Sequence, residues 1–235
     1  MKRVWTLARK ELSVAFDNVT AYVILTIFLL ITGWFFSSTL FLQNVASLRT
    51  LFDLIPVLFL FFIPALTMGT FAEERRAGTI ELLLTLPVRD WEVIAGKWLG
   101  AFLLLVIGIG LTLIYAITLA ILGNPDTGAL TGGYLGILFL GASSISIGVF
   151  ASSLTRNQMV AFVLGFAFIF ILTLVDKIAV FFPTWLSGIL QYLSLDFHYQ
   201  NMLRGVIDTR DILYFLSVIG CSGLLTAQYL AKRPD

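Results

Sequence analysis

The stretch WLGAFLLLVIGIGLTLIYAITLAIL, Trp98–Leu122, decides the fold class of this chain. It contains no ionisable side chain, and at ~1.5 Å of helix rise per residue it is long enough to cross ~30 Å of bilayer hydrocarbon. In lipid a helix pairs its backbone N–H and C=O groups within one segment, and no alternating pattern of a membrane barrel strand is present. The stretch therefore predicts a transmembrane helix.

The remainder of the sequence repeats this pattern. The mean hydropathy is +0.96, with 59% hydrophobic and 12% charged residues, a profile typical of membrane-embedded proteins. Together with 98–122, the uncharged stretches are 20–41, 54–71, 134–154, 159–175 and 212–231. We expect an all-α membrane protein with six transmembrane helices and one domain, residues 1–235. The fifth stretch is short unless it continues through Asp176 and Lys177.

The basic residues fall unequally on the two sides of such a bundle. One side receives Lys2, Arg3, Arg9, Lys10, Arg75, Arg76, Arg89, Lys97, Arg156, Lys232 and Arg233. The other side receives Arg49, Lys177, Arg204 and Arg210. Because loops rich in Lys and Arg stay in the cytoplasm, we expect a multi-pass membrane protein with both termini cytoplasmic.

Two flanking segments are expected to lie along the membrane surface. In residues 1–19 an apolar stripe indicates an amphipathic interfacial helix, because a solvated helix would leave Trp5 and Phe16 exposed. The stripe consists of Val4, Trp5, Ala8, Leu12, Ala15, Phe16 and Val19. In the outer segment, 176–211, Pro183 interrupts the apolar run 178–195. We favour short re-entrant or interfacial helices there over a seventh span.

Several kinds of chemistry lack the residues they need. The six spans carry no Asp, Glu, Lys, Arg or His, which disfavours an ion-coupled transporter. Lys97 is followed by Trp98 rather than Ser or Thr, so no phosphate-binding loop is present. One histidine, His198, and one cysteine, Cys221, do not make a metal site, and we expect His198 at the surface. The chain is therefore expected to be no enzyme, with no metal or cofactor of its own.

The segment 72–97 is the main cytoplasmic connection between spans. Gly78 is expected to end a helix there, and Thr79 and Asp90 to begin two further helices. Between them, the short helix Ile80–Leu86 is apolar around most of its surface, with Pro87 ending it. Such a surface is buried on lipid, on the bundle or on another protein. From the residues alone, docking to a partner and resting on the membrane are equally favoured.

This segment resembles a signature of the ABC-2-type permeases, the membrane subunits of ATP-binding-cassette exporters. The signature is E-E-R-x-x-G-T-I-E-x-L-L-x-x-P. The matching residues are Glu73, Glu74, Arg75, Gly78, Thr79, Ile80, Glu81, Leu83, Leu84 and Pro87, and Arg76 lies between them at a variable position and belongs to the same expected coupling site. A second stretch, LRGVIDTRDILYFLS at Leu203–Ser217, is similar to the subgroup of gliding-motility and nitrous-oxide-reductase-maturation permeases.

The resemblance implies a division of labour. A separate cytoplasmic ATPase would bind ATP and Mg²⁺ and would grip the signature residues as its coupling site. A second permease chain, identical or paralogous, would complete the pathway through the lipid bilayer of the bacterial inner membrane, and any accessory outer subunit would come from another protein. The helix at 1–19 would correspond to the family's connecting helix. Nothing implies nucleic-acid binding, and the sequence does not specify the substrate.

Small residues and one proline suggest how the spans pack. Gly141, Ser144, Gly148, Ala151 and Ser152 recur at helical spacing, which in lipid allows close helix approach, at a dimer seam or inside one subunit. Gly96 and Gly100 form another such pair. Pro64 is a kink or hinge candidate near the coupling segment. The alternative to an exporter subunit is a membrane-embedded assembly or anchoring protein that docks the same partner without transport.

Overall fold

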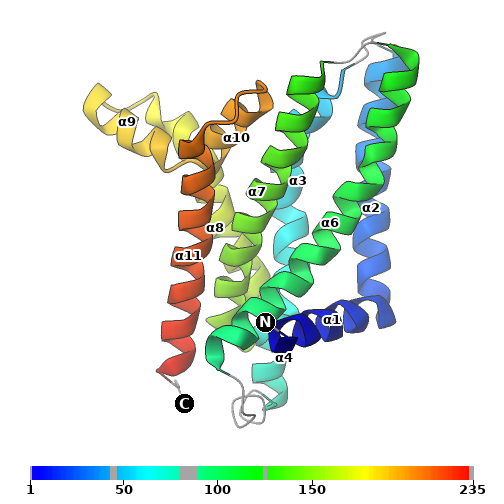
Figure 1. Ribbon diagram of the computed structural model, residues 1–235. Helices are drawn as coiled ribbons and strands as arrows, with labels where there is room; N and C mark the ends of the chain where they lie inside the picture. Colours follow the sequence, from blue (N-terminus) through cyan, green and yellow to red (C-terminus); the bar gives the residue numbers. More distant parts are fainter. Residues whose placement is uncertain (1, 43–46, 80–88, 124–125, 233–235) are drawn as a thin grey trace.

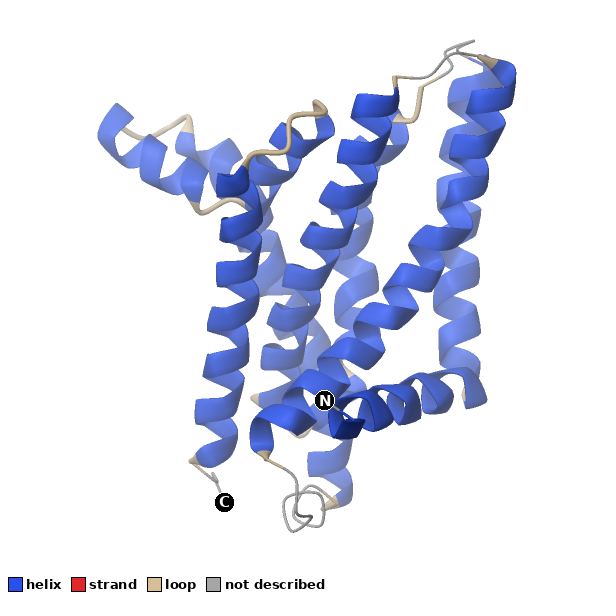
Figure 2. Ribbon diagram, viewed as in Figure 1, coloured by secondary structure: helices blue, strands red, loops and turns tan. Residues whose placement is uncertain are grey.

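The computed structural model describes residues 2–42, 47–79, 89–123 and 126–232, and all regular structure in these ranges is helical (Figures 1 and 2). The helices are α1 (Lys2–Asp17), α2 (Val19–Ser37), η1 (Ser38–Leu42), α3 (Arg49–Thr67), α4 (Gly69–Ala77), α6 (Asp90–Leu122), α7 (Thr127–Ser153), α8 (Gln158–Ala179), α9 (Thr184–Tyr192), α10 (Leu195–Leu203) and α11 (Thr209–Ala231). Six stretches in the described ranges are long and apolar enough to span a membrane. The all-α membrane fold with six spans is confirmed.

The helices extend beyond the uncharged stretches at several ends. The second candidate span joins α3 and α4 over Arg49–Ala77, and the third is one helix, Asp90–Leu122. The fifth, α8, includes Asp176 and Lys177. Of the connecting segment 72–97, residues 72–77 therefore belong to α4 and 90–97 to α6. Charged residues that flank the uncharged stretches are carried on these helix ends.

Helix α7 is the centre of the bundle. In its most apolar window 78% of the residues are buried, whereas the corresponding share is 22% for α2 and 17% for α11. Its glycines explain the burial, because a Cβ at Gly141 would overlap Leu105 of α6 and lie 3.2 Å from Phe59 of α3. A Cβ at Gly133 would overlap the ring of Phe52. Small side chains thus let α3, α6 and α7 approach within van der Waals contact, which drives helix association in lipid.

Polar side chains cap the first turns of several of these helices. Asp126 accepts hydrogen bonds from two backbone N–H groups of α7, Asn157 from one of α8, Ser194 from one of α10 and Asp208 from one of α11. Each satisfies donors that have no partner within the first helical turn. Asp90 was expected to be such a cap, but it is the first residue of α6, and Arg89 occupies the cap position. There the Glu92 carboxylate accepts from the backbone N–H of Arg89, at 3.0 Å.

Helix α1 lies across one end of the bundle, where Figure 1 also shows both chain termini and α4. It packs against α6, because a Cβ at Gly96 would lie 2.6 Å from Leu7 and one at Gly100 2.7 Å from Glu11. Leu7 therefore faces the protein although it lies outside the predicted apolar stripe. Trp5, which belongs to that stripe, is 57% exposed and so faces away from the bundle. The helix has two apolar sides, one for α6 and one left for lipid.

At the opposite end, α9 and α10 are nine residues each, about 14 Å of helix, too short to cross a bilayer. The expectation that His198 lies at the surface is wrong, since its side chain is buried. Its Nδ1 lies 2.6 Å from Asp211 Oδ1, and its Nε2 3.1 Å from the Tyr192 carbonyl oxygen. The sequence places Asp211 one residue before the uncharged stretch 212–231, so this partner was not identified. The pair ties α10 to α11.

A second contact anchors α10 to the core. The Tyr199 hydroxyl donates to the Phe52 carbonyl oxygen of α3 at 2.8 Å. Burial, with smaller contributions from Asp53 and Asp196, raises the pKa of Tyr199 well above its usual 10.0. The phenol therefore stays protonated and keeps donating throughout the physiological pH range.

Candidate functional site

The first half of the signature lies at the end of α4. Residues 73–77 are helical, and Gly78 ends the helix in the left-handed conformation, with φ 70°. The backbone N–H of Thr79 donates to the carbonyl oxygen of Glu74 at 3.0 Å, which closes the helix end. Thr79 thus belongs to the close of α4. The expected coupling helix with Ile80, Glu81, Leu83 and Leu84, and Pro87 after it, lies outside the described residues.

The four consecutive charged residues at the end of α4, Glu73 to Arg76, point in two directions. Glu74 and Arg75 are half-buried, whereas Glu73 and Arg76 are exposed. The Arg75 guanidinium lies 5.0 Å from the centroid of the Tyr229 ring on α11, a cation–π contact. Glu73 and Arg76 are therefore available to another molecule, while the inner two residues fasten α4 to the bundle.

Lys97 is the centre of a buried ion cluster that connects three helices. Its Nζ lies 2.7 Å from Glu74 Oε1 on α4 and 3.1 Å from Glu11 Oε1 on α1. The lysine side chain is 3% exposed, against 20% for Glu74 and 27% for Glu11. Two carboxylates offset the cost of burying this ammonium group. The Lys97 cluster, meaning Glu11, Glu74 and Lys97, therefore links the signature to α1 and to the third span.

Sequence reasoning did not identify the Lys97 cluster. Lys97 appeared as the last charge before a span, and Glu11 was not singled out. The partners are 86 and 23 residues from Lys97 along the chain. A usable signal was the pair Gly96 and Gly100, since glycines that flank a lysine at helical spacing allow another helix to come close enough to pair with it.

The joint between α3 and α4 is stabilised by a side chain of α7. Ser152 Oγ accepts from the backbone N–H of Phe71 at 3.0 Å and of Ala72 at 3.1 Å, and it donates to the carbonyl oxygen of Met68 at 2.9 Å. A hydroxyl inserted into a helix ladder in this way produces a local bend. The regular helix is accordingly interrupted at Met68, four residues after the hinge candidate Pro64.

The other small residues of α7 surround the same joint. A Cβ at Gly148 would overlap the side chain of Thr67, the last residue of α3. Ala151 faces Gly165 of α8, and Pro64 lies beside them, because a Cβ at Gly165 would be 3.7 Å from Ala151 and 3.5 Å from Pro64. Ser144 is fully buried. In this structure the small-residue face of α7 thus packs against helices of the same subunit. Gly141 belongs to this face but lies farther from the joint between α3 and α4.

These contacts join α4 to four other helices of the bundle. The signature helix α4 is fixed to α7 through Ser152, to α6 and α1 through Lys97, and to α11 through Arg75. A force applied at the end of α4 would therefore reach most of the bundle.

A comparison with protein families decides the assignment. Residues 5–219 match the model of the ABC-2 family transporter protein. The chain belongs to this family. The match includes the signature at the end of α4, the helices that the Lys97 cluster joins and the segment with α9 and α10.

Curated ABC-2 relatives agree with this assignment. The chain is 33% identical over 97 residues to the "Probable multidrug ABC transporter permease YbhR" of Escherichia coli K12, and 32% identical over 95 residues to the "Inner membrane transport permease YhhJ" of the same strain. These alignments cover 41% and 40% of this chain, and about a quarter of each relative, 26% and 25%. Both relatives are named as permeases, in keeping with a membrane component rather than an enzyme. They do not favour the anchoring alternative.

Proposed function

We propose that this chain is the membrane subunit of an ATP-binding-cassette exporter, driven by a separate cytoplasmic ATPase that binds ATP and Mg²⁺. The observation that carries the proposal is that a chain of the ABC-2 family holds its charged signature on a helix fastened to four other helices of the bundle. The exposed Glu73 and Arg76, with the apolar residues that follow Gly78 in the sequence, supply the grip for that ATPase.

The expected orientation in the membrane follows from the end of the molecule that carries the signature. Helices α1 and α4 lie there with both termini (Figure 1), and so does most of the basic charge. We propose that this end is cytoplasmic and that two permease chains, identical or paralogous, pair in the bacterial inner membrane. The exposed apolar faces of α2, α8 and α11 are available for lipid and for the second chain.

The choice of cargo is a separate question. The name of one relative refers to multiple drugs. We extend to this chain the class of ABC exporter and not that relative's cargo. Membership of the gliding-motility and nitrous-oxide-reductase-maturation subgroup rests on the segment Leu203–Ser217 and stays a prediction. That segment contains Asp211, the partner of His198. At least one of the residues that carry the similarity therefore has a structural role, whatever the cargo.

The proposal predicts the composition of the native complex. Affinity purification of the full chain from its own membranes is expected to recover an ATPase with a Walker phosphate-binding loop, in a stoichiometric amount, together with a second permease chain. Mass spectrometry of every co-purified subunit is the measurement. A complex whose partners include no nucleotide-hydrolysing subunit would instead support an anchoring role.

A further inference from the structure

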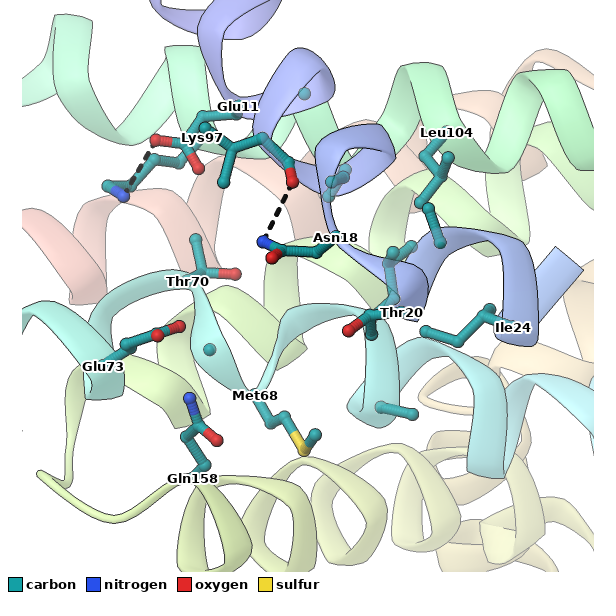
Figure 3. Close-up of a pocket in the computed structure, with 18 of the residues that line it drawn as sticks. Glu11, Asn18, Thr20, Ile24, Met68, Thr70, Glu73, Lys97, Leu104 and Gln158 are labelled. Carbon is teal, nitrogen blue, oxygen red and sulfur yellow. Dashed lines mark hydrogen bonds and ion pairs between the residues drawn. The ribbon is translucent and has the colours of Figure 1, made fainter.

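Buried charges lie near both ends of the bundle, in different surroundings. At the end with α1 and α4, Glu11 and Lys97 lie beside an open cavity of about 380 Å³ (Figure 3). At the other end, where Figure 1 shows α9 and α10, the side chains of His198 and Asp211 are only 2% and 4% exposed. The His198 ring stacks on the ring of Tyr214, with centroids 3.9 Å apart. The pair of His198 and Asp211 is therefore closed off from water.

Both ring nitrogens of His198 face hydrogen-bond acceptors. The Tyr192 carbonyl oxygen, 3.1 Å from Nε2, accepts and cannot donate, so Nε2 carries a hydrogen. Nδ1 lies 2.6 Å from Asp211 Oδ1, and because two lone pairs would repel at that distance, a second proton lies between these atoms. The pair therefore holds one proton more than a neutral imidazole beside an ionised carboxylate, and its net charge is zero.

Removal of this proton leaves one ring hydrogen for two acceptors. It also leaves a net negative charge in a buried place, where Asp211 Oδ2 has no hydrogen-bond partner among the described residues. A hydrogen bond to an ionised carboxylate is roughly twice as strong as one to a neutral carbonyl, so the remaining hydrogen stays on Nδ1 of His198. Nε2 then presents a lone pair to the Tyr192 carbonyl oxygen. That contact changes from attractive to repulsive.

The weakened contact is the one that holds the end of α9. Tyr192 is the last residue of α9, and His198 joins its carbonyl group to Asp211 on α11. Helix α10, by contrast, keeps its separate hydrogen bond from Tyr199 to the Phe52 carbonyl oxygen of α3. Loss of the proton is therefore expected to loosen α9 while α10 stays anchored.

The other charged side chains at this end of the molecule have partners or positions of their own. Lys177 of α8 pairs with Asp176 at 2.9 Å and with Asp196 of α10 at 2.8 Å. Asp53 of α3 accepts a hydrogen bond from Gln200, at 3.3 Å. The remaining titratable or charged groups on the packed elements here are Tyr192 on α9, Tyr199 on α10, Asp208, Arg210 and Tyr214 at the start of α11, and Tyr134 on α7. Within the described residues, the ion pair of His198 is with Asp211.

We propose that His198, Asp211 and the Tyr192 carbonyl group form a proton-dependent latch, which holds α9 to α11 at low pH and releases α9 as the pH rises. In the orientation proposed above, this end of the molecule faces the outside of the cell, so the latch responds to the pH there. The latch itself rests on neither transport nor an ATPase, because every group in it belongs to the described residues of this chain.

The proton is followed by ¹⁵N NMR of the full-length chain in nanodiscs, with labelled histidine and no histidine tag, because His198 is the one histidine of the sequence. From about pH 5 to about pH 9, which spans the usual range of histidine titration, both ring nitrogens are expected to carry hydrogen at first and only Nδ1 at the end.

The position of α9 is measured in parallel by the distance between two spin labels, on Thr184→Cys of α9 and Thr131→Cys of α7, in a Cys221→Ser background. Both labelled positions are exposed. Over the same pH range the ratio of released to docked α9 is expected to rise about tenfold, the effect of losing one buried hydrogen bond.

Asp211→Asn is the decisive variant. Its amide group donates to Nδ1 of a neutral ring, while Nε2 keeps its hydrogen for Tyr192, so no additional proton is needed and the pH dependence is expected to disappear. If this variant folds poorly, His198→Gln, which cannot titrate, is expected to remove the dependence as well. Asp53→Asn changes an exposed carboxylate on α3 and is expected to keep it.

Three results would overturn the proposal. The first is a wild-type distance that does not respond to pH. The second is an Asp211→Asn protein, or in its place a His198→Gln protein, that responds as the wild-type chain does. The third is loss of the hydrogen from Nδ1 instead of Nε2.

Discussion

Replacement of Lys97 by methionine is expected to destabilise the folded chain by about 3 kcal/mol, because it leaves the two carboxylates of the Lys97 cluster close together without their common cation. Methionine keeps the length and apolar body of the lysine, so loss of the charge is the main change. The effect is expected at the contact between α1 and α6, where the cluster lies. Thermal unfolding of the purified protein in detergent measures it.

Two further variants test this explanation. Lys177→Met makes the same substitution at a lysine whose side chain is 58% exposed in its pairs with Asp176 and Asp196, and a cost below about 1 kcal/mol is expected. The triple variant Glu11→Gln, Lys97→Met, Glu74→Gln removes all three charges and is expected to recover most of the lost stability. A Lys97→Met protein that unfolds at the same temperature as Lys177→Met would show that the cluster contributes little.

Replacement of Gly148 by leucine is expected to be at least as damaging. The added Cβ would overlap Thr67 at the end of α3, and both helices are buried there. Overpacking of a tight core usually costs about 1–3 kcal/mol, and here the neighbouring helix must also move. We expect separation of α7 from the joint between α3 and α4, seen as a lower unfolding temperature and as faster proteolysis near residue 79.

The matched control is Gly220→Leu. Gly220 lies on α11, a Cβ there meets nothing within 4 Å, and the substitution adds the same side chain to a transmembrane helix. Near-normal stability is expected for this variant. If Gly148→Leu proved as stable as Gly220→Leu, the close packing of α7 on α3 would not be needed for the fold.

The six spans could be predicted from the sequence because long uncharged stretches leave few other options in lipid. The helix ends could not, since Asp90 and Lys97 are charged yet belong to the same helix as Trp98–Leu122. For His198, a single histidine without a nearby acidic cluster favoured the surface. Its partner, Asp211, is 13 residues away and is brought to it only by the turn between α10 and α11.

In the candidate site, too, local features could be predicted from the sequence, whereas contacts between distant residues could not. Gly78 was identified as a helix end because glycine adopts positive φ without strain, and its φ of 70° agrees. The small residues of α7 were predicted to allow close packing, but the role of Ser152 depends on backbone groups of α3 and α4, 80 to 84 residues distant. Pairings over such distances leave no periodic pattern in one sequence, so they required the three-dimensional arrangement.

We propose that an ATPase drives this chain through the segment that follows Gly78. The most direct test is the ATP hydrolysis rate of the purified complex in proteoliposomes, with the wild-type chain and with Leu83→Asp. We predict that the wild-type chain raises the rate above that of the ATPase alone, whereas Leu83→Asp inserts normally but leaves the rate at the level of the isolated ATPase. Equal stimulation by both chains would contradict the claim.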